Sequence, residues 1–257
     1  MKLSIIVPGI RYMLWDKLYE TIFQSCTKYD FEVIFVGPFM DGNSSLWNIM
    51  NVKYIRDFGC PSRALQIGSV FAEGEYLTYT SDDCISRKNS LDKVLDNINS
   101  DIVSLQYSES PNFSGNQHPL EYYNAWHHRD LQCKNVDKDW KIPIIFLMKT
   151  SLYYEYGGLD CRFEHINMNL HDMAFRMQMD NKVVEVSEDC VWDANYVHRQ
   201  DTDPVIAAFK QNDKPLFDSI WDIDKFDREL KIDINNWKQA SEIWDRRCSN
   251  ENTHNRT

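Results

Sequence analysis

The first hundred residues alternate between short apolar runs and segments that carry apolar residues at helical spacing. The runs are short and flanked by turn-forming or polar residues, so they predict strands at residues 3–7, 31–36, 52–55, 76–80 and 102–107. Between them, apolar residues recur every three or four positions, which predicts helices. This order predicts an α/β fold with a doubly wound, mostly parallel sheet flanked by helices. Ligands of such sheets bind beyond the carboxyl ends of the strands.

The next hundred residues are less regular. Residues 108–141 are polar and aromatic without a clear period, which predicts an irregular functional loop or insertion. An apolar run returns at residues 142–148. A helix is expected over residues 169–179, and a strand over residues 183–186. Asn169 is the expected N-cap of this later helix, as Ser62 is of the helix that precedes the fourth strand.

The C-terminal part is rich in aromatic residues as far as about Trp244. Helices that pack against the domain or against a partner are therefore expected over residues 201–247. Residues 248–257 are polar and cannot bury enough surface to offset the entropy of ordering them, so they predict a disordered tail. The whole chain of 257 residues is expected to form one domain with this extension.

The charge balance limits the partners. The formal net charge is -11, and a protein that grips a nucleic-acid polymer needs a basic surface, so that class is excluded. A small nucleotide remains possible if its diphosphate is neutralised locally, for example by a divalent cation that carboxylates hold.

The cysteines and the apolar runs bear on location. The seven cysteines are scattered, odd in number and form no C-x-x-C pair, which disfavours a disulfide framework and a structural zinc site and favours a reducing, cytoplasmic location. The N-terminal apolar run is too short for a signal peptide, and no run is long enough to cross a membrane.

Two acids follow the fourth predicted strand directly. Asp82 and Asp83 would lie where the sheet opens to ligand, and Mg²⁺ or Mn²⁺ prefers such oxygen ligands together with substrate phosphates. A turn without metal is the structural alternative, because acids after a strand are common turn formers.

A third acid lies in the later helix. Asp172 and Arg176 are four residues apart, which predicts a salt bridge and, from local features alone, a structural role. His198 follows an aromatic and apolar segment and is either a metal ligand or an exposed histidine at a strand end. His171 and the pair His127-His128 match no metal-binding spacing.

Several segments, taken in order, resemble family 2 glycosyltransferases of the GT-A fold. The similar segments are residues 4–8, 32–36, 61–64 with Gln66 and Gly68, and 72–77 leading into 81–83; later come Gly157-Gly158-Leu159-Asp160 with Phe163, and His171-Asp172 with Arg176. The resemblance covers residues 3 to about 200. It implies a nucleotide-sugar-binding half at residues 1–107 and an acceptor-binding, catalytic half at residues 108–200.

The resemblance also implies roles for single residues. Asp83 would be the metal-binding acid of the D-x-D element, and His198 would complete the metal shell. Asp172 would be the catalytic base, which removes the proton of the acceptor hydroxyl as its oxygen attacks the anomeric carbon with inversion. The expected nucleotide-sugar contacts are Pro8, Gly9, Arg11, Arg63, Ser81 and Asp82. Trp126, Gly158 and His171 are expected on the acceptor side.

The resemblance implies a UDP-sugar or similar donor, Mn²⁺ or Mg²⁺ as cofactor, and a glycan, lipid-linked or protein acceptor. Some positions depart from the family pattern. Gly37-Pro38 follow the second strand, where the family has an acid, and His171 and Ala174 replace acids beside the catalytic position. Two other classes therefore stay open: a non-catalytic nucleotide- or sugar-binding module, and a sugar nucleotidyltransferase. The loop after the first strand is too poor in glycine and lysine to favour the last.

Overall fold

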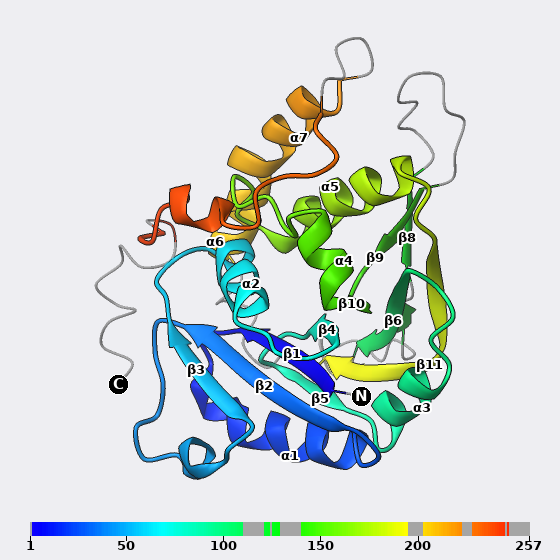
Figure 1. Cartoon of the computed structure of the whole chain (residues 1–257). Helices are drawn as coiled ribbons and strands as arrows, with labels where there is room; N and C mark the ends of the chain where they lie inside the picture. Colours follow the sequence, from blue (N-terminus) through cyan, green and yellow to red (C-terminus); the bar gives the residue numbers. More distant parts are fainter. Residues whose placement is uncertain are drawn as a thin grey trace.

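A nine-stranded sheet runs through the molecule, in the order β3-β2-β1-β4-β10-β6-β11-β5, with β7 paired to β6 (Figure 1). The computed structural model describes residues 2–109, 121–123, 125–128, 140–194, 203–222, 228–244 and 246. Strands β3 (Val52–Arg56), β2 (Asp30–Gly37), β1 (Lys2–Pro8) and β4 (Tyr76–Tyr79) are parallel to one another. The central β1 and the neighbouring β2 are buried almost throughout, which explains why their buried residues are nearly all apolar, apart from Ser4 and Glu32.

The second half of the sheet is mixed. Strand β10 (Phe146–Lys149) is antiparallel to both β4 and β6 (Ile102–Glu109), and β11 (Val184–Ala194) is parallel to β6. The short strands β5 (Cys84–Ser86) and β7 (Glu121–Tyr123) add antiparallel edges. Strands β8 (Ala125–His128) and β9 (Trp140–Pro143) form a separate two-stranded sheet.

Helices cover both faces of the sheet (Figure 1). On one face lie α1 (Trp15–Ser25) and α3 (Ser90–Asp96); on the other lie α2 (Pro61–Val70), α4 (Thr150–Glu155) and α5 (Ile166–Met179). Short 3-10 turns, η1 (Tyr12–Leu14) and η2 (Ser45–Asn48), precede α1 and β3. Helix α2 lies so close to the sheet that a Cβ on Gly68 would overlap the side chain of Ile6.

The C-terminal part packs on the helix face that carries α5. It contains α6 (Asp203–Ala208), the π-helix η6 (Phe209–Asp213), α7 (Lys214–Ile220) and the 3-10 turn η7 (Asn236–Gln239). Phe217 and Trp221 contact the ring of Phe175 on α5, with ring centroids 5.8 and 5.1 Å apart. The expected C-terminal helices are present over residues 203–220, where their aromatic side chains explain why they dock, whereas the described residues 228–244 contain only one 3-10 turn.

Both predicted N-caps are wrong. Helix α2 is capped by Cys60, whose sulfur accepts the N–H of Arg63 at 3.4 Å, and not by Ser62. Helix α5 begins three residues before Asn169 and is capped by His165, whose Nδ1 accepts the N–H of Asn167 at 2.8 Å. Asp172 therefore lies in the interior of α5 and not in its first turn.

The apolar run at residues 142–148 contributes to two strands. It breaks after Pro143, so that β9 pairs with β8 while β10 enters the main sheet. The sequence pattern also missed β5, β7 and β8, which have only three or four residues each. Residues 248–257, predicted as a tail, lie outside the described residues. Within the described part of the chain, no helix has the length and apolar character needed to cross a membrane.

Candidate active site

The loop after β1 is tied to the end of β4 by one carboxylate. Strands β1 and β4 are neighbours, with Ile6 opposite Tyr79, so the segments that follow them lie beside each other. The Oδ2 atom of Asp82 accepts the backbone N–H groups of Ile10 and Arg11 at 2.8 and 2.7 Å. Asp82 is 1% exposed, so this carboxylate fixes the shape of the loop from inside the protein.

Arg11 links both acids of the pair. Its Nε donates to Oδ1 of Asp82 at 2.8 Å, its Nη2 reaches the same oxygen, and its Nη1 lies 3.1 Å from Oδ2 of Asp83. Ser81 donates from its hydroxyl to Oδ1 of Asp83. Burial raises the pKa of Asp83, and the positive charge of Arg11 only partly opposes this.

Gly9 is required by the same packing. A Cβ at this position would lie 2.6 Å from Oδ2 of Asp82, where the loop N–H groups bind. The N–H of Gly9 donates to the carbonyl of Val36 at 3.0 Å, which ties the loop to β2 as well. Five residues predicted around the nucleotide (Gly9, Arg11, Ser81, Asp82 and Asp83) therefore form one connected group; Pro8 ends the strand that leads into it.

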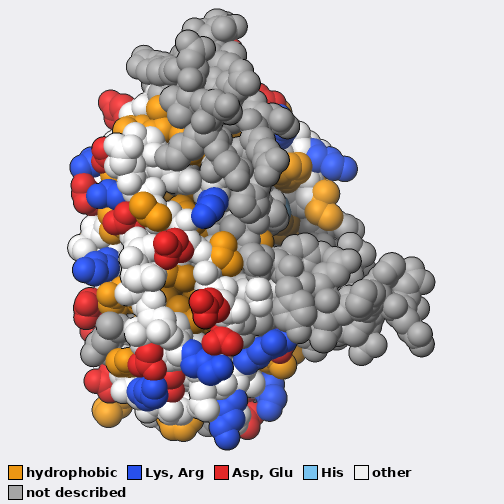
Figure 2. All heavy atoms as spheres, turned by 90° about the vertical axis from the view of Figure 1, so that its right-hand side faces the viewer, with side chains coloured by type: hydrophobic (Ala, Val, Ile, Leu, Met, Phe, Trp, Pro, Cys, Tyr) orange, Lys and Arg blue, Asp and Glu red, His pale blue; other side chains and the backbone are white. Residues whose placement is uncertain are grey.

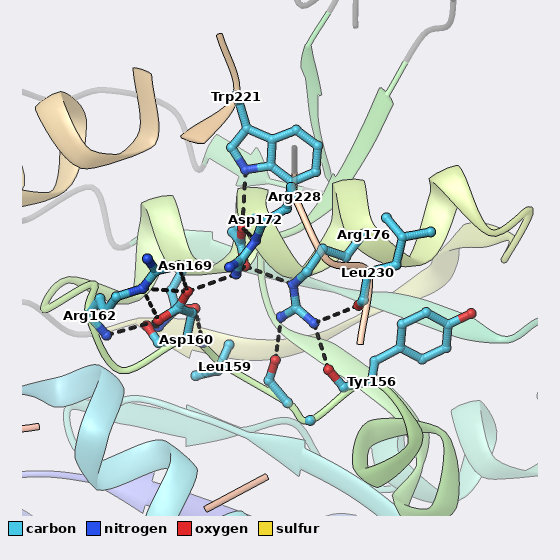
Figure 3. Close-up of polar contacts among 12 residues, drawn as sticks. Tyr156, Leu159, Asp160, Arg162, Asn169, Asp172, Arg176, Trp221, Arg228 and Leu230 are labelled. Atoms are coloured by element: carbon cyan, nitrogen blue, oxygen red, sulfur yellow. Dashed lines mark hydrogen bonds and ion pairs between the residues drawn. The ribbon is translucent and has the colours of Figure 1, made fainter. Parts of the chain in front are cut away.

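Asp172 is the centre of a second group, which Figure 3 shows in close-up. It is 0% exposed, and each of its oxygens accepts two hydrogen bonds. Arg176 donates from Nε to Oδ2 at 2.8 Å, and Trp221 donates from Nε1 to Oδ1 at 3.1 Å. Arg228 binds both oxygens, from Nε at 3.0 Å and from Nη2 at 2.8 Å. The predicted i,i+4 salt bridge with Arg176 is thus present and fully buried.

Arg228 joins Asp172 to a further acid. Its Nη2 also lies 2.7 Å from Oδ2 of Asp160, which Arg162 binds from the other side (Figure 3). Burial on its own would raise the pKa of Asp160, but the hydrogen bond from Arg162 and the charges of the two arginines outweigh it and lower the pKa. A cavity of about 350 Å³ opens beside this cluster; Asp160, Arg162, Arg228, Ile232, Asn236 and Gln239 are among its lining residues.

Arg63 belongs to neither group. Its Nε binds Asp57 at 3.0 Å, and its Nη1 donates to the backbone carbonyls of Trp237 and Ala240, the latter at 2.8 Å. Its guanidinium also lies over the ring of Trp237, 5.4 Å from the centroid. In this structure Arg63 therefore holds the C-terminal part of the chain against α2.

The acceptor-side residues are placed unequally. Gly158 has a φ of +64°, and its carbonyl accepts a hydrogen bond from Arg176, so it adjoins the Asp172 group. His171 is 8% exposed; its Nδ1 lies 2.9 Å from the carbonyl oxygen of Asn167, and its ring packs edge-on against Phe175. Trp126 is in β8, but its side chain lies outside the described residues, as does the whole of His198.

Sequence reasoning missed Arg228. It lies 56 residues after Asp172, in a run of alternating charges that is typical of a solvated surface, and no local spacing links the two. Trp221 carried a signal, because an aromatic residue in a polar C-terminal segment predicts a docked anchor.

The two groups differ in what they could hold. Both oxygens of Asp82 are used by the loop and Arg11, whereas Asp83 offers a carboxylate whose Oδ2 contacts the guanidinium of Arg11. Among the residues that the structure describes, no three His, Cys, Asp or Glu side chains converge as a metal site. A hard cation that takes most of its ligands from phosphates and water needs only one or two carboxylates, so Asp83 fits such an ion.

Comparisons with known proteins identify the fold. The sequence matches no model of a protein family and no curated protein. The structure is similar to S. aureus TarS 1–349 in complex with UDP, at 17% identity over 86% of this chain and 70% of that chain, with a TM-score of 0.55. It is similar to S. aureus TarS 1–349, at 16% identity over 98% of this chain and 73% of that one, with a TM-score of 0.56. A longer S. aureus TarS chain matches at 16% identity over 82% of this chain and 43% of its own length, with a TM-score of 0.52.

At these identities the likeness concerns the fold. The prediction of a GT-A type α/β fold is confirmed, with its curled, mostly parallel sheet and C-terminal helical region. The roles predicted for single residues, the metal, the domain halves and membership of family 2 stay predictions.

Proposed function

We propose that this chain is a glycosyltransferase that moves a sugar from a nucleotide-diphosphate sugar, with UDP as the favoured nucleotide, to an acceptor hydroxyl. The observation that carries the proposal is the connected group at the ends of β1 and β4. There, Asp82 holds the Gly9–Arg11 loop beside Asp83, at the edge of a doubly wound sheet where such folds bind ligands. A solved protein of the same fold is in complex with UDP, which supports the choice of nucleotide.

The two adjacent acids have different roles in this proposal. Asp82 shapes the loop, whose backbone would contact the nucleotide. Asp83 would hold Mn²⁺ or Mg²⁺, which supplies charge stabilisation for the diphosphate leaving group when bound. Arg11 contacts Asp83 through Nη1 while its other nitrogens bind Asp82; in this proposal, Nη1 would bind a phosphate once the metal ion takes the carboxylate of Asp83.

Asp172 would act as the general base. In the reaction, its carboxylate would take the proton of the acceptor hydroxyl, the oxygen would bond to the anomeric carbon, and the bond to the nucleotide diphosphate would break with inversion. Asp172 can do this only if one of its four hydrogen bonds is exchanged for the acceptor, because both oxygens are occupied. The salt bridge with Arg176 would remain in place during this exchange.

The nucleotide-binding module without catalysis is the second candidate. The complete burial of Asp172 favours it, since a carboxylate that is 0% exposed and fully hydrogen-bonded can also have a purely structural role.

The four described cysteines, all buried, are free, which accords with the cytoplasmic location that we also propose.

Donor hydrolysis separates the two candidates. We expect the parent protein with Mn²⁺ to release UDP from a UDP-sugar, using water as acceptor, and Asp172→Asn to lose at least about 100-fold of that rate, as is typical when a general base is removed. Equal inactivity of the parent and the variant, with UDP binding retained in both, would support the binding module.

Figure 2 bears on the excluded class of nucleic-acid binders. On the described part of the face that it shows, Lys and Arg side chains lie among Asp and Glu side chains; several gather at the lower end, but no continuous basic stripe runs across the face. This agrees with the choice of a small nucleotide as ligand.

A further inference from the structure

The C-terminal strap, which we define as residues 228–244, contacts Asp172, the base of the proposed reaction, at one end. Its first residue, Arg228, binds Asp172 and Asp160. Farther along, its backbone carbonyls accept hydrogen bonds from Gln66 and Arg63 on α2. The strap thus spans from the proposed base to the helix that carries Arg63 (Figure 1).

The strap is held by polar contacts and by a few apolar side chains, since Ile234 and Trp237 pack against the core while partly buried. Of its residues only Trp244 is fully buried, while the others are half-buried or exposed. Asn236 is a typical anchor: its side chain accepts the N–H of Cys161 at 2.8 Å and donates to the carbonyl of Leu159 at 2.9 Å. Segments with little buried apolar surface open at lower free energy than the core, so the strap can detach without global unfolding.

Arg228 differs from the other partners of Asp172. Arg176 comes from the same helix, and Trp221 comes from the end of α7. Arg228 is the one described partner that the strap contributes to this carboxylate, and it occupies one position on each oxygen. If Arg228 leaves, Trp221 and Arg176 still bind one oxygen each, so the carboxylate stays oriented and gains two free acceptor positions.

Charge balance permits this departure. Asp172 keeps Arg176, and Asp160 keeps Arg162, so each buried acid retains one guanidinium. Removal of the only partner of a buried charge is strongly destabilising, but here Arg228 is shared by two acids that are each paired already. The cavity of about 350 Å³ lies between the strap, which contributes Arg228, Ile232, Asn236, Gln239 and Ala240 to its lining, and Asp160–Arg162 on the other side.

We propose that Arg228 is a latch: with the strap closed it blocks Asp172, and when the strap opens the acceptor takes the place of Arg228 on the carboxylate. The catalytic role of the latch rests on the proposed function, whereas the contact between Arg228 and Asp172 and its opening are tested separately. Because the closed form cannot accept a proton at Asp172, activity in the free protein scales with the open fraction.

The test is chemical access to the carboxylate. A water-soluble carbodiimide with glycine ethyl ester labels exposed carboxyl groups, and peptide mass spectrometry reports the rate at Asp172. We expect Arg228→Ala to raise that rate at least about tenfold, since minor open states are commonly populated at a tenth or less. Lys231→Ala is the matched control: it removes another strap cation, paired with the exposed Glu155, and leaves the rate at Asp172 as in the parent.

A second acid reports on folding in the same sample. Asp92 is 2% exposed on α3, on the opposite face of the sheet, and accepts the backbone N–H groups of Thr27 and Lys28. It should stay unlabelled in every variant. Arg228→Gln repeats the experiment with a side chain that keeps a hydrogen-bond donor. Unchanged labelling of Asp172 in both Arg228 variants would overturn the latch, and so would labelling of Asp92 in both, which would make Arg228 a structural cross-link.

An activity measurement then connects the latch to catalysis. With UDP-glucose or UDP-N-acetylglucosamine and Mn²⁺, Arg228→Ala should raise the rate of UDP release by water, and adding Asp172→Asn should abolish the gain. If labelling of Asp172 rises while no variant hydrolyses any donor, the latch stands and the proposed transferase function fails. If the parent hydrolyses donor and Arg228→Ala changes neither rate nor labelling, the function stands and the latch fails.

Discussion

Asp82 and Asp83 are adjacent acids of similar burial, but their contacts differ: Asp82 holds the loop after β1, whereas Asp83 makes few contacts that stabilise the fold. We predict that Asp82→Asn destabilises the protein strongly and that Asp83→Asn does not. Asp82 accepts two backbone N–H groups on one oxygen and the Arg11 side chain on the other. An asparagine has the same shape, but its NH₂ group would face either the two backbone N–H groups or Arg11. The donors on that side would then lack an acceptor.

The expected magnitude comes from the hydrogen bonds that Asp82 accepts. Hydrogen bonds to a charged group contribute about 1.5–3 kcal/mol each, and leaving a buried donor unpaired costs about 1–3 kcal/mol. We therefore expect Asp82→Asn to cost about 3 kcal/mol, which for a chain of this size lowers Tm by about 9 °C. Asp83 binds the Ser81 hydroxyl and one Arg11 nitrogen, and burial already favours its uncharged form. Asp83→Asn should therefore cost less than about 1 kcal/mol.

Urea unfolding of the parent and the two variants, followed by circular dichroism at pH 7.5, measures both free energies. A smaller midpoint shift in Asp82→Asn than in Asp83→Asn would refute the assignment of Asp82 as the residue that holds the loop. Equal, large shifts would show that the two acids act as one structural unit.

Two further predictions concern the frame around the site. Burial lowers the pKa of His165 to about 4, from about 6.5 when unfolded; stability is therefore lost as the pH falls from 6.5 to 4, by about 3 kcal/mol in total. His165→Asn keeps a side chain that can cap Asn167, so the variant should unfold with a flatter pH dependence between pH 7 and 4.5; an unchanged slope would contradict this. Gly158→Ala should cost at least about 2 kcal/mol, because φ is +64° and the Cβ would overlap the Tyr153 ring, whereas Gly42→Ala, with open space around it, should be nearly neutral in the same unfolding assay.

Much of the first half of the fold was predictable from the sequence. Strands β1 and β2 are buried on both faces, so nearly all of their residues had to be apolar; the two buried polar side chains, Ser4 and Glu32, bind each other. The acids after β4 indicated the carboxyl edge of the sheet. The pair of strands β9 and β10 was not separable, because Ile144 and Ile145 are as apolar as the strands that they connect.

The site was predictable only in part, because its contacts join distant residues. That Asp82, and not Asp83, holds the loop depends on hydrogen bonds to backbone groups 71 and 72 residues earlier, which no local pattern reveals. The N-cap of α5 was misplaced because asparagine is a common N-cap and histidine is not. His165 caps the helix through a ring nitrogen. The side chain of Asn169 instead accepts the N–H of Asp160 at 2.9 Å. Arg228 reaches Asp172 across 56 residues and looks like an ordinary surface charge in the sequence.

The central claim is a nucleotide-diphosphate site at the end of β4 that depends on Asp83, and thermal unfolding with ligands tests it most directly. Since a ligand that binds only the folded state raises its stability, UDP at about 100 times its Kd should stabilise the parent by about 2.7 kcal/mol. The account predicts a rise in Tm that requires UDP and Mn²⁺ together and disappears in Asp83→Asn. A parent that responds to no nucleoside diphosphate with or without metal, or an Asp83→Asn variant that responds like the parent, would contradict it.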